Sequence, residues 1–186
     1  LKAIVAIHDT TLGPALGGCR MWNYDNEEEA LIDVLRLSKG MTYKAAIAGL
    51  KLGGGKSVII GNSKTDKTQD LFESFGEFVD NLNGKYITAE DVGTTEEDME
   101  VVRTKTQYVT GVSKKHGGSG DPSLLTSYGV YLGIKSAVKY KLKRESLESL
   151  KIAIQGLGNV GMDLCKYLSN DGAKIYVSDI DQSKVD

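Results

Sequence analysis

A glycine-rich turn between a strand and a helix places the strongest constraint on how this chain folds. The turn runs from Gly156 to Gly161 (GLGNVG) and follows the apolar, β-branched segment 152–154. Apolar residues at helical spacing come next, and a second β-branched segment ends at Asp179, about 20 residues beyond Gly158. Strand, G-x-G-x-x-G turn, helix, strand and terminal acid form the pattern of a dinucleotide-binding βαβ unit.

Each part of this pattern has a physical role toward a dinucleotide. Glycines permit a tight turn and let the backbone approach the pyrophosphate, while the helix N-terminus supplies positive potential. The carboxylate of Asp179 would bind the adenosine ribose and repel a 2′-phosphate, which favours NAD over NADP. A glycine-rich turn without a cofactor stays open as the alternative. The predicted cofactor-binding residues are Gly156, Gly158, Asn159, Val160, Gly161 and Asp179.

A second glycine cluster, GLKLGGGKS at residues 49–57, invites comparison with the phosphate loop of nucleotide hydrolases, G-x-x-x-x-G-K-[ST]. The spacing is wrong, because Leu50 stands where the first glycine is required. The context is also wrong, because Ser57 opens a β-branched segment typical of a strand, whereas a phosphate loop leads into a helix. We therefore disfavour a phosphate-loop hydrolase and expect the glycines 53–55 to form a turn beside Lys56 that approaches another ligand.

Two lysines and an aspartate form a second candidate for chemistry. Desolvation beside the predicted turn would lower the pKa of Lys56 and let this lysine act as a general base. Lys44 would stay charged and bind a carboxylate, and Asp91 closes a predicted strand at residues 86–89. From these residues alone, the alternative that both lysines are solvated surface residues stays open.

The rest of the chain alternates strands with helices, which indicates an α/β fold. Strands are predicted at residues 3–8, 58–60, 86–89 and 108–112, and helices at 26–37, 71–82, 94 or 95 to 102, and 124–141. The polar, glycine-rich stretch 114–123 predicts a boundary between a domain of residues 1–117 and the start of a dinucleotide-binding domain at 118–186. Only two strands of that second sheet fit before the last residue, so we expect an internal fragment of a longer protein.

Composition disfavours several classes of function. The net charge of -2 argues against nucleic acid as a partner, and no apolar run is long enough for a transmembrane helix. No signal-peptide pattern opens the chain, and two cysteines far apart in sequence favour a reduced, cytoplasmic protein. Two histidines do not make a zinc site, so no metal is expected.

Five segments resemble those of the Glu/Leu/Phe/Val dehydrogenases, which oxidatively deaminate L-amino acids with a nicotinamide cofactor. The resemblance runs in order along nearly the whole chain. It implies an N-terminal α/β domain for substrate binding and oligomerisation, a Rossmann-type domain that binds NAD, and a homo-oligomer acting on a small amino acid. The five segments are residues 12–22 (LGPALGGCRMW), 39–46 (KGMTYKAA), 52–61 (LGGGKSVIIG), 86–95 (YITAEDVGTT) and 154–161 (IQGLGNVG).

The resemblance also implies roles for single residues. Lys44 would hold the substrate α-carboxylate, Lys56 would be the general base, and Asp91 would assist proton transfer. Thr126 would lie near the nicotinamide. After hydride transfer from Cα, Lys56 would activate water to attack the iminium carbon, and ammonia and a 2-oxo acid would leave.

Substrate preference is implied by fewer positions. Leu16 stands where glutamate-specific members carry a lysine for the side-chain carboxylate, so an apolar substrate is implied. The backbone at Gly17 and Gly18 would lie along that substrate. Thr88 to Asp91 (TAED), with Ala89 in the pocket, resembles the leucine enzymes, whereas GGCRM and LGGGK lean toward the phenylalanine enzymes. We favour leucine and other branched-chain amino acids, with phenylalanine, or a non-catalytic NAD-binding regulatory fragment, as alternatives.

Overall fold

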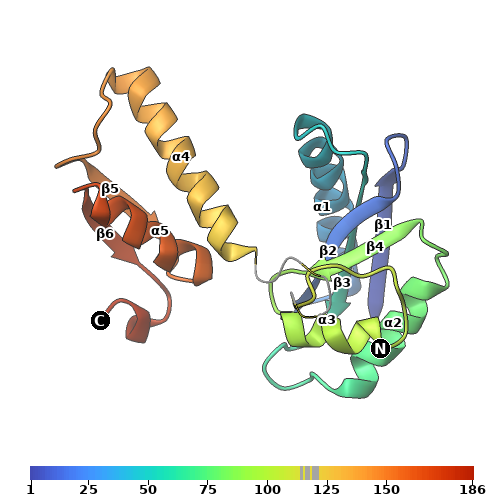
Figure 1. Cartoon of the computed structure of the whole chain (residues 1–186). Coiled ribbons are helices and arrows are strands. Elements are labelled where there is room, and N and C mark those ends of the chain that lie inside the picture. The colour runs from blue at the N-terminus through green and yellow to red at the C-terminus, as the bar shows by residue number, and fades with distance from the viewer. Residues whose placement is uncertain (114, 116–117, 119–121) are drawn as a thin grey trace. The chain divides into compact units, whose positions relative to one another are not determined.

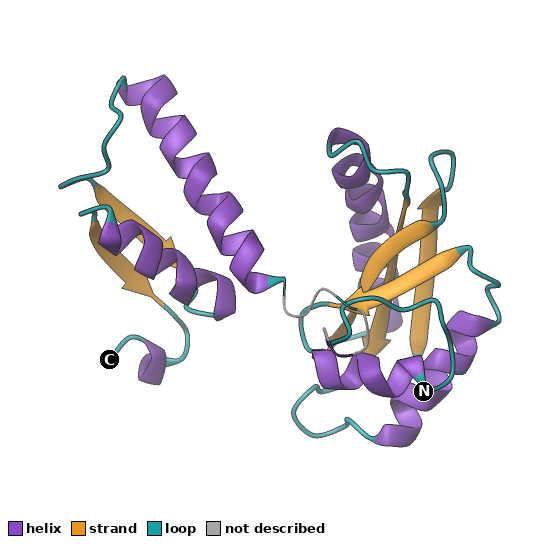
Figure 2. Cartoon of the chain, in the orientation of Figure 1, coloured by secondary structure: helices purple, strands orange, loops and turns teal. Residues whose placement is uncertain are grey.

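The computed structural model describes residues 1–113, 115, 118 and 122–186, and their contacts divide the chain into two compact units, residues 1–120 and 121–186. Each unit combines strands with helices, which confirms the predicted α/β fold (Figures 1 and 2). Most of the predicted boundary at residues 114–123 lies outside the described residues. In the part of the chain that the structure describes, no helix is long and apolar enough to cross a membrane.

A four-stranded mixed sheet forms the centre of the first unit. Its strands are β1 (Ala3–Asp9), β2 (Ala15–Trp22), β3 (Gly53–Ile60) and β4 (Tyr86–Glu90), in the order β1-β3-β2-β4. Strand β2 runs parallel to β3 and β4, whereas β1 runs antiparallel to β3. Strands β2 and β3 are therefore the inner strands, with a hydrogen-bonded neighbour on each side.

Helices cover both faces of this sheet, which gives the unit three layers (Figure 2). On one face, α1 (Glu27–Ile47) packs on β1 and β3 through Ala6, Ala30, Val34 and Val58. On the other face, α2 (Gln69–Asp80) and α3 (Glu96–Arg103) enclose the larger core. That core includes Cys19, Met21, Ile59, Phe72, Phe75, Val79, Tyr86, Met99 and Val102.

Side-chain caps fix where two of these helices begin. Asn26 accepts a hydrogen bond of 2.9 Å from the main-chain N–H of Glu29, which satisfies one of the free donors in the first turn of α1. Thr95 and Asp98 form a reciprocal capping box at the start of α3. Both helices therefore start where the sequence predicts.

Helix α1 does not end near residue 37, as the sequence predicts, but continues to Ile47. Buried Ser38 and Ala45 keep its inner face in contact with the sheet across Gly40, which would otherwise weaken the helix. Tertiary packing thus overrides the local propensity, and the segment that carries Lys44 is helical.

The strands of the first unit differ from the predictions in three places. The glycines 53–55 belong to β3, so the predicted turn beside Lys56 is wrong. Residues 108–112 form a single bridge, between Val109 and Thr88, instead of a strand. Strand β2 was not predicted, because its glycine pair hides the alternation of core and site positions.

The second unit contains the predicted strand, glycine turn, helix and strand. Strands β5 (Lys151–Gln155) and β6 (Lys174–Ser178) pair in parallel, and α5 (Asn159–Asn170) connects them. Helix α4 (Ser123–Leu142) packs against α5, and a 3₁₀ turn, η2 (Gln182–Lys184), follows β6. The core between them is built on Leu147, Ile154, Leu164 and Leu168.

Candidate active site

One face of the sheet in the first unit gathers several predicted site residues. Side chains alternate between faces along a strand, so Leu16, Gly18 and Arg20 of β2 share the face that α1 covers in part. Parallel pairing places Gly18 beside Ala89 of β4. The predicted substrate residues Leu16, Gly18 and Ala89 are therefore neighbours on this face, although they come from two segments far apart in sequence.

Lys56 lies inside β3 on the same face, and its side chain is only 6% exposed. Burial lowers the pKa of Lys56; the nearby Asp91 carboxylate opposes this, the Arg20 guanidinium reinforces it, and the net shift is downward. A lysine held this way loses its proton more readily than a solvated one. The alternative of solvated surface lysines is therefore wrong for Lys56, and a phosphate loop is also disfavoured, because Lys56 is in a strand.

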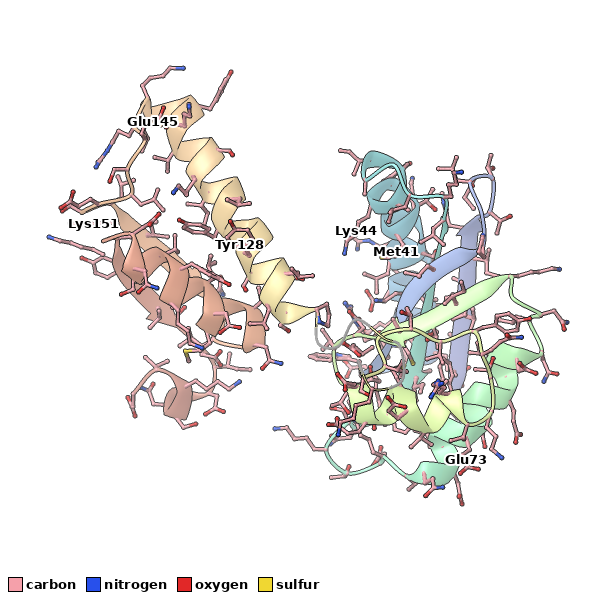
Figure 3. The ribbon with its side chains drawn as sticks, viewed as in Figure 1. Met41, Lys44, Glu73, Tyr128, Glu145 and Lys151 are labelled. Carbon is pink, nitrogen blue, oxygen red and sulfur yellow. The ribbon has the colours of Figure 1, made fainter. Side chains whose placement is uncertain are left out.

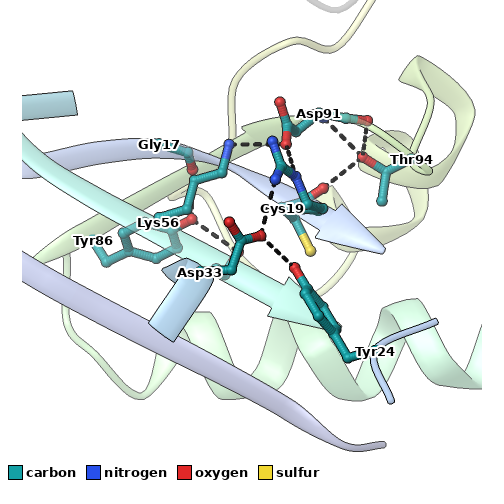
Figure 4. A network of polar contacts seen from close by, with 10 residues as sticks. Gly17, Cys19, Tyr24, Asp33, Lys56, Tyr86, Asp91 and Thr94 are labelled. Carbon is teal, nitrogen blue, oxygen red and sulfur yellow. Dashed lines mark hydrogen bonds and ion pairs between the residues drawn. The ribbon is translucent and has the colours of Figure 1, made fainter. Parts of the chain in front are cut away.

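Asp91 follows β4 and contacts two cations with one oxygen. Its Oδ2 lies 3.0 Å from Nζ of Lys56 and 3.0 Å from Nε of Arg20 (Figure 4). Burial alone would raise the pKa of this carboxyl, but the two cations outweigh it and the pKa lies below its ordinary value. The main-chain N–H of Asp91 donates to Oγ1 of Thr94, which donates to the carbonyl of Cys19. Asp91 is thus ionised and fixed at both its backbone and its side chain.

The predicted glycine pair has different surroundings at each residue. A Cβ on Gly17 would lie 1.7 Å from the carbonyl oxygen of Gly55, so β2 and β3 approach too closely for any side chain there. Gly17 also points toward the core, and its carbonyl accepts a hydrogen bond from the buried hydroxyl of Tyr86. A Cβ on Gly18 would lie 2.4 Å from the carbonyl oxygen of Glu90. Packing thus accounts for both glycines, and only Gly18 shares the face of Lys56.

Lys44 is exposed on α1 (Figure 3). Within the described residues its side chain has no ion-pair partner. Asp33 and Lys44 are about three helical turns apart, so they lie along the same edge of α1. Asp33 reaches β2 through an ion pair of 2.9 Å with Arg20. The edge of α1 that carries Lys44 therefore borders the β2 side of the site, where an unpaired ammonium can bind a carboxylate.

In the second unit, the glycine turn has open space where a ligand would lie. Gly156 has φ of 94°, a conformation that favours glycine, and a Cβ on Gly156 or Gly158 would meet no described atom within 4 Å. By contrast, a Cβ on Gly161 would lie 2.0 Å from the carbonyl oxygen of Gly156. No described side chain caps α5, which begins at Asn159 and Val160, so its first N–H groups can bind an anion. The turn therefore fits the pyrophosphate of a dinucleotide.

Asp179 follows β6 and lies at this turn, as predicted. Its Oδ1 accepts a hydrogen bond of 2.9 Å from the N–H of Asp181, and its Oδ2 one of 2.6 Å from the N–H of Leu157. These main-chain donors hold the pKa of Asp179 below its ordinary value. Thr126 lies exposed in the first turn of α4.

Sequence reasoning missed three side chains of the first site, namely Arg20, Tyr24 and Asp33. Arg20 contacts both Asp91 and Asp33, and the Tyr24 hydroxyl donates to Asp33 at 2.7 Å. One signal was present: Arg20 lies two residues beyond Gly18, and in a strand that spacing returns a side chain to the same face. This spacing is informative only once residues 15–22 are known to form a strand.

Together these features define a class, the two-part α/β dehydrogenases, with a lysine–aspartate pair in one unit and a dinucleotide-type turn in the other. The chain belongs to the Glu/Leu/Phe/Val dehydrogenase family, as the sequence predicts. The Glu/Leu/Phe/Val dehydrogenase dimerisation domain matches residues 1–108, and the Glutamate/Leucine/Phenylalanine/Valine dehydrogenase domain matches residues 117–183.

The chain is similar to several enzymes of known activity. It is 58% identical over 185 residues to leucine dehydrogenase of Bacillus subtilis (strain 168), a match that covers 100% of this chain and 51% of that protein. It is 49% identical over 185 residues to phenylalanine dehydrogenase of Caldalkalibacillus thermarum, covering 100% and 50%. The crystal structure of L-tryptophan dehydrogenase from Nostoc punctiforme matches with a TM-score of 0.70 and 49% identity, covering 99% and 51%. The chain thus spans about half the length of the curated relatives it matches.

Proposed function

We propose that the full-length protein is an NAD-dependent dehydrogenase that deaminates an apolar L-amino acid, with leucine and other branched-chain amino acids favoured. The observation that carries this proposal is the contact of 3.0 Å between buried Lys56 and Asp91, in a chain of this family. The 58% identity to a leucine dehydrogenase supports the substrate. In this proposal residues 1–117 form the substrate domain of a cytoplasmic homo-oligomer, and residues 118–186 begin the cofactor domain.

The face of the sheet suggests how the substrate would bind. Lys44 would bind its α-carboxylate, and the backbone beside Gly17 and Gly18 would lie along it. Leu16 and Ala89 would contact the side chain. Since Leu16 offers no charge to a second carboxylate, a glutamate side chain would be buried there without a partner, which costs more than burying a methyl group.

The chemistry follows from the protonation of Lys56. NAD, when bound, accepts a hydride from Cα of the substrate. Neutral Lys56 takes a proton from the water that attacks the resulting iminium carbon and returns that proton to the nitrogen. As the C–N bond breaks, Lys56 takes the remaining hydroxyl proton, which leaves the carbonyl group. Ammonia and the 2-oxo acid leave. Throughout, the Asp91 carboxylate stabilises the charged form of Lys56 and keeps its Nζ in place.

The cofactor would bind at the glycine turn of the second unit. Gly156 and Gly158 would let the pyrophosphate approach the backbone, and the N–H groups of Asn159, Val160 and Gly161 at the start of α5 would bind it. Asp179 would favour NAD by repelling a 2′-phosphate. In this proposal Thr126 lies near the nicotinamide.

Lys56→Ala tests the proposal in the full-length protein, with Lys64→Ala as a control at an exposed lysine of the same unit. We expect Lys56→Ala to abolish NADH formation from L-leucine while NADH binding, measured by fluorescence titration, stays at the parent level. Turnover undiminished by Lys56→Ala would overturn the role of Lys56.

Measurements on the same full-length protein distinguish two alternative functions. Comparison of kcat/KM for L-leucine, L-valine and L-phenylalanine decides between a leucine and a phenylalanine dehydrogenase. The second alternative is considered because the chain is 49% identical to a phenylalanine dehydrogenase. NAD binding without turnover of any amino acid would favour a non-catalytic regulatory protein.

A further inference from the structure

Arg20 lies between two carboxylates on the site face of the sheet. Its Nε lies 3.0 Å from Oδ2 of Asp91, and its Nη1 lies 2.9 Å from Oδ2 of Asp33 (Figure 4). The same oxygen of Asp91 lies 3.0 Å from Nζ of Lys56. The four side chains therefore form one chain of alternating charge that runs from α1 through β2 to β3.

The geometry of these contacts suits an arginine. A planar guanidinium presents donors in several directions at once, so one side chain can hold two carboxylates at a fixed angle. An ammonium would act as a point charge and would fix the relative orientation of the two carboxylates less well. Asp33 is fixed in turn by the Tyr24 hydroxyl, and burial together with Asp33 raises the pKa of Tyr24, so this hydroxyl stays a donor.

The charged and titratable groups around Lys56 come from several elements. Asp91 favours the charged ammonium, while Arg20 disfavours it. The buried Cys19 thiol is a weaker neighbour, and His8 of β1 is bonded to Thr42 of α1 on the same face. Asp33 acts on Lys56 through Arg20, because it neutralises part of the guanidinium charge.

We propose that Arg20 and Asp33 are positioning residues: Arg20 shares the Asp91 carboxylate with Lys56, and Asp33 holds Arg20 in place. This inference rests on the proposed role of Lys56 as the general base. If Arg20 were neutral, Lys56 would keep Asp91 to itself and hold its proton more tightly. If Asp33 were neutral, the uncompensated charge of Arg20 would promote loss of that proton.

The two substitutions therefore displace the pH profile in opposite directions. In Arg20→Gln, we expect the acid limb of kcat/KM for L-leucine to move to higher pH. The value of kcat/KM at pH 7 should fall about tenfold for every pH unit by which the limb moves. In Asp33→Asn, which keeps an oxygen for Arg20 and Tyr24, we expect the limb to move to lower pH. If Arg20 and Asp33 only stabilised the fold, the two substitutions would not move the acid limb in opposite directions.

Controls separate this inference from the proposed function. Arg103→Gln changes an exposed arginine of α3 and should leave the profile unchanged. Arg20→Lys should return the acid limb toward the parent position but leave kcat below it, since charge is restored without the bridge. The inference fails if Arg20→Gln and Asp33→Asn both keep the parent profile or move it in the same direction while Lys56→Ala is inactive. If Lys56→Ala stays active, the proposed function fails as well.

Discussion

The main-chain N–H of Leu157 donates a 2.6 Å hydrogen bond to Oδ2 of Asp179, which ties the glycine turn to the end of β6. The carboxylate therefore supports the turn from within, and in the proposed function it also selects the cofactor. These two roles can be separated, because an amide oxygen can accept from Leu157 without carrying a charge.

Substitutions at Asp179 should show this separation. We expect Asp179→Asn to keep the turn and narrow the preference for NADH over NADPH, because the repulsion of a 2′-phosphate is lost. Asp179→Ala leaves the Leu157 N–H without its acceptor and should weaken binding of both cofactors, by about tenfold for the loss of a charged hydrogen bond. Fluorescence titration with each cofactor measures both effects, and identical behaviour of the two variants would contradict the supporting role.

Two glycines of the same turn form a matched pair. Gly158 borders open space, so Gly158→Ala should leave the free energy of unfolding within about 0.5 kcal/mol of the parent but obstruct the cofactor. Gly161→Ala places a Cβ against the Gly156 carbonyl and should reduce both stability and cofactor affinity. Urea unfolding and NADH titration test the pair. If Gly158→Ala binds NADH as the parent does, the open space is not the pyrophosphate site.

A second matched pair lies in the first unit. A Cβ on Gly54 would lie 2.1 Å from Oγ1 and 2.2 Å from N of Thr42, so Gly54→Ala must displace α1 and should cost about 1–3 kcal/mol. A Cβ on Gly40, inside α1, meets no described atom within 4 Å, so Gly40→Ala should stabilise the helix by about 0.5–1 kcal/mol. Urea denaturation of both variants checks the opposite signs.

Several elements follow from local sequence alone. The turn at Gly156 and the position of Asp179 were predictable, because glycine spacing, strand and helix agree over one continuous segment. The Lys56 site was harder. Its pairing with Asp91 came from a family resemblance, and the placement of Lys56 in a strand depends on partners on both sides of β3, which no local pattern of GGGK reveals.

The contacts of Arg20 and Asp33 could not be predicted from the sequence. Their ion pair joins β2 to α1, and Arg20 also reaches Asp91, which lies 71 residues further along the chain. Sequence spacing constrains contacts within one helix or strand, whereas these contacts depend on how separate elements pack. An arginine and an aspartate at such positions look like ordinary surface residues until β2 is placed beside α1.

Burial of Lys56 should also affect how the free energy of unfolding depends on pH. Its pKa in the folded protein lies below the ordinary 10.5, so between these two values the unfolded chain binds more protons and stability rises with pH. Lys56→Met removes this dependence and leaves Asp91 paired with Arg20. The stability of the variant relative to the parent should therefore be greatest near neutral pH and decline as pH approaches 10.5. Urea unfolding at several pH values measures the difference, and a constant difference would contradict it.

The two cysteines should differ in reactivity. Cys19 is fully buried, and burial raises the pKa of its thiol to about 12, so little thiolate forms at pH 8. Cys165 is partly exposed. We expect iodoacetamide to modify Cys165 first in the native protein and Cys19 only after unfolding, as followed by mass spectrometry. Equal rates would contradict the burial of Cys19.

Along β2, substitutions at even-numbered and odd-numbered residues should have different effects, because these residues lie on opposite faces of the sheet. Leu16 and Arg20 are partly exposed on the site face, and Gly18 between them packs against Glu90. The odd positions from Ala15 to Met21 are buried in the core or against a neighbouring strand. If Leu16 and Ala89 contact the substrate as proposed, a library that varies these two residues should change substrate preference at little cost to folding. Most substitutions at the odd positions should instead destabilise the fold. The two faces of β2 can therefore be varied separately, one for the site and one for the core.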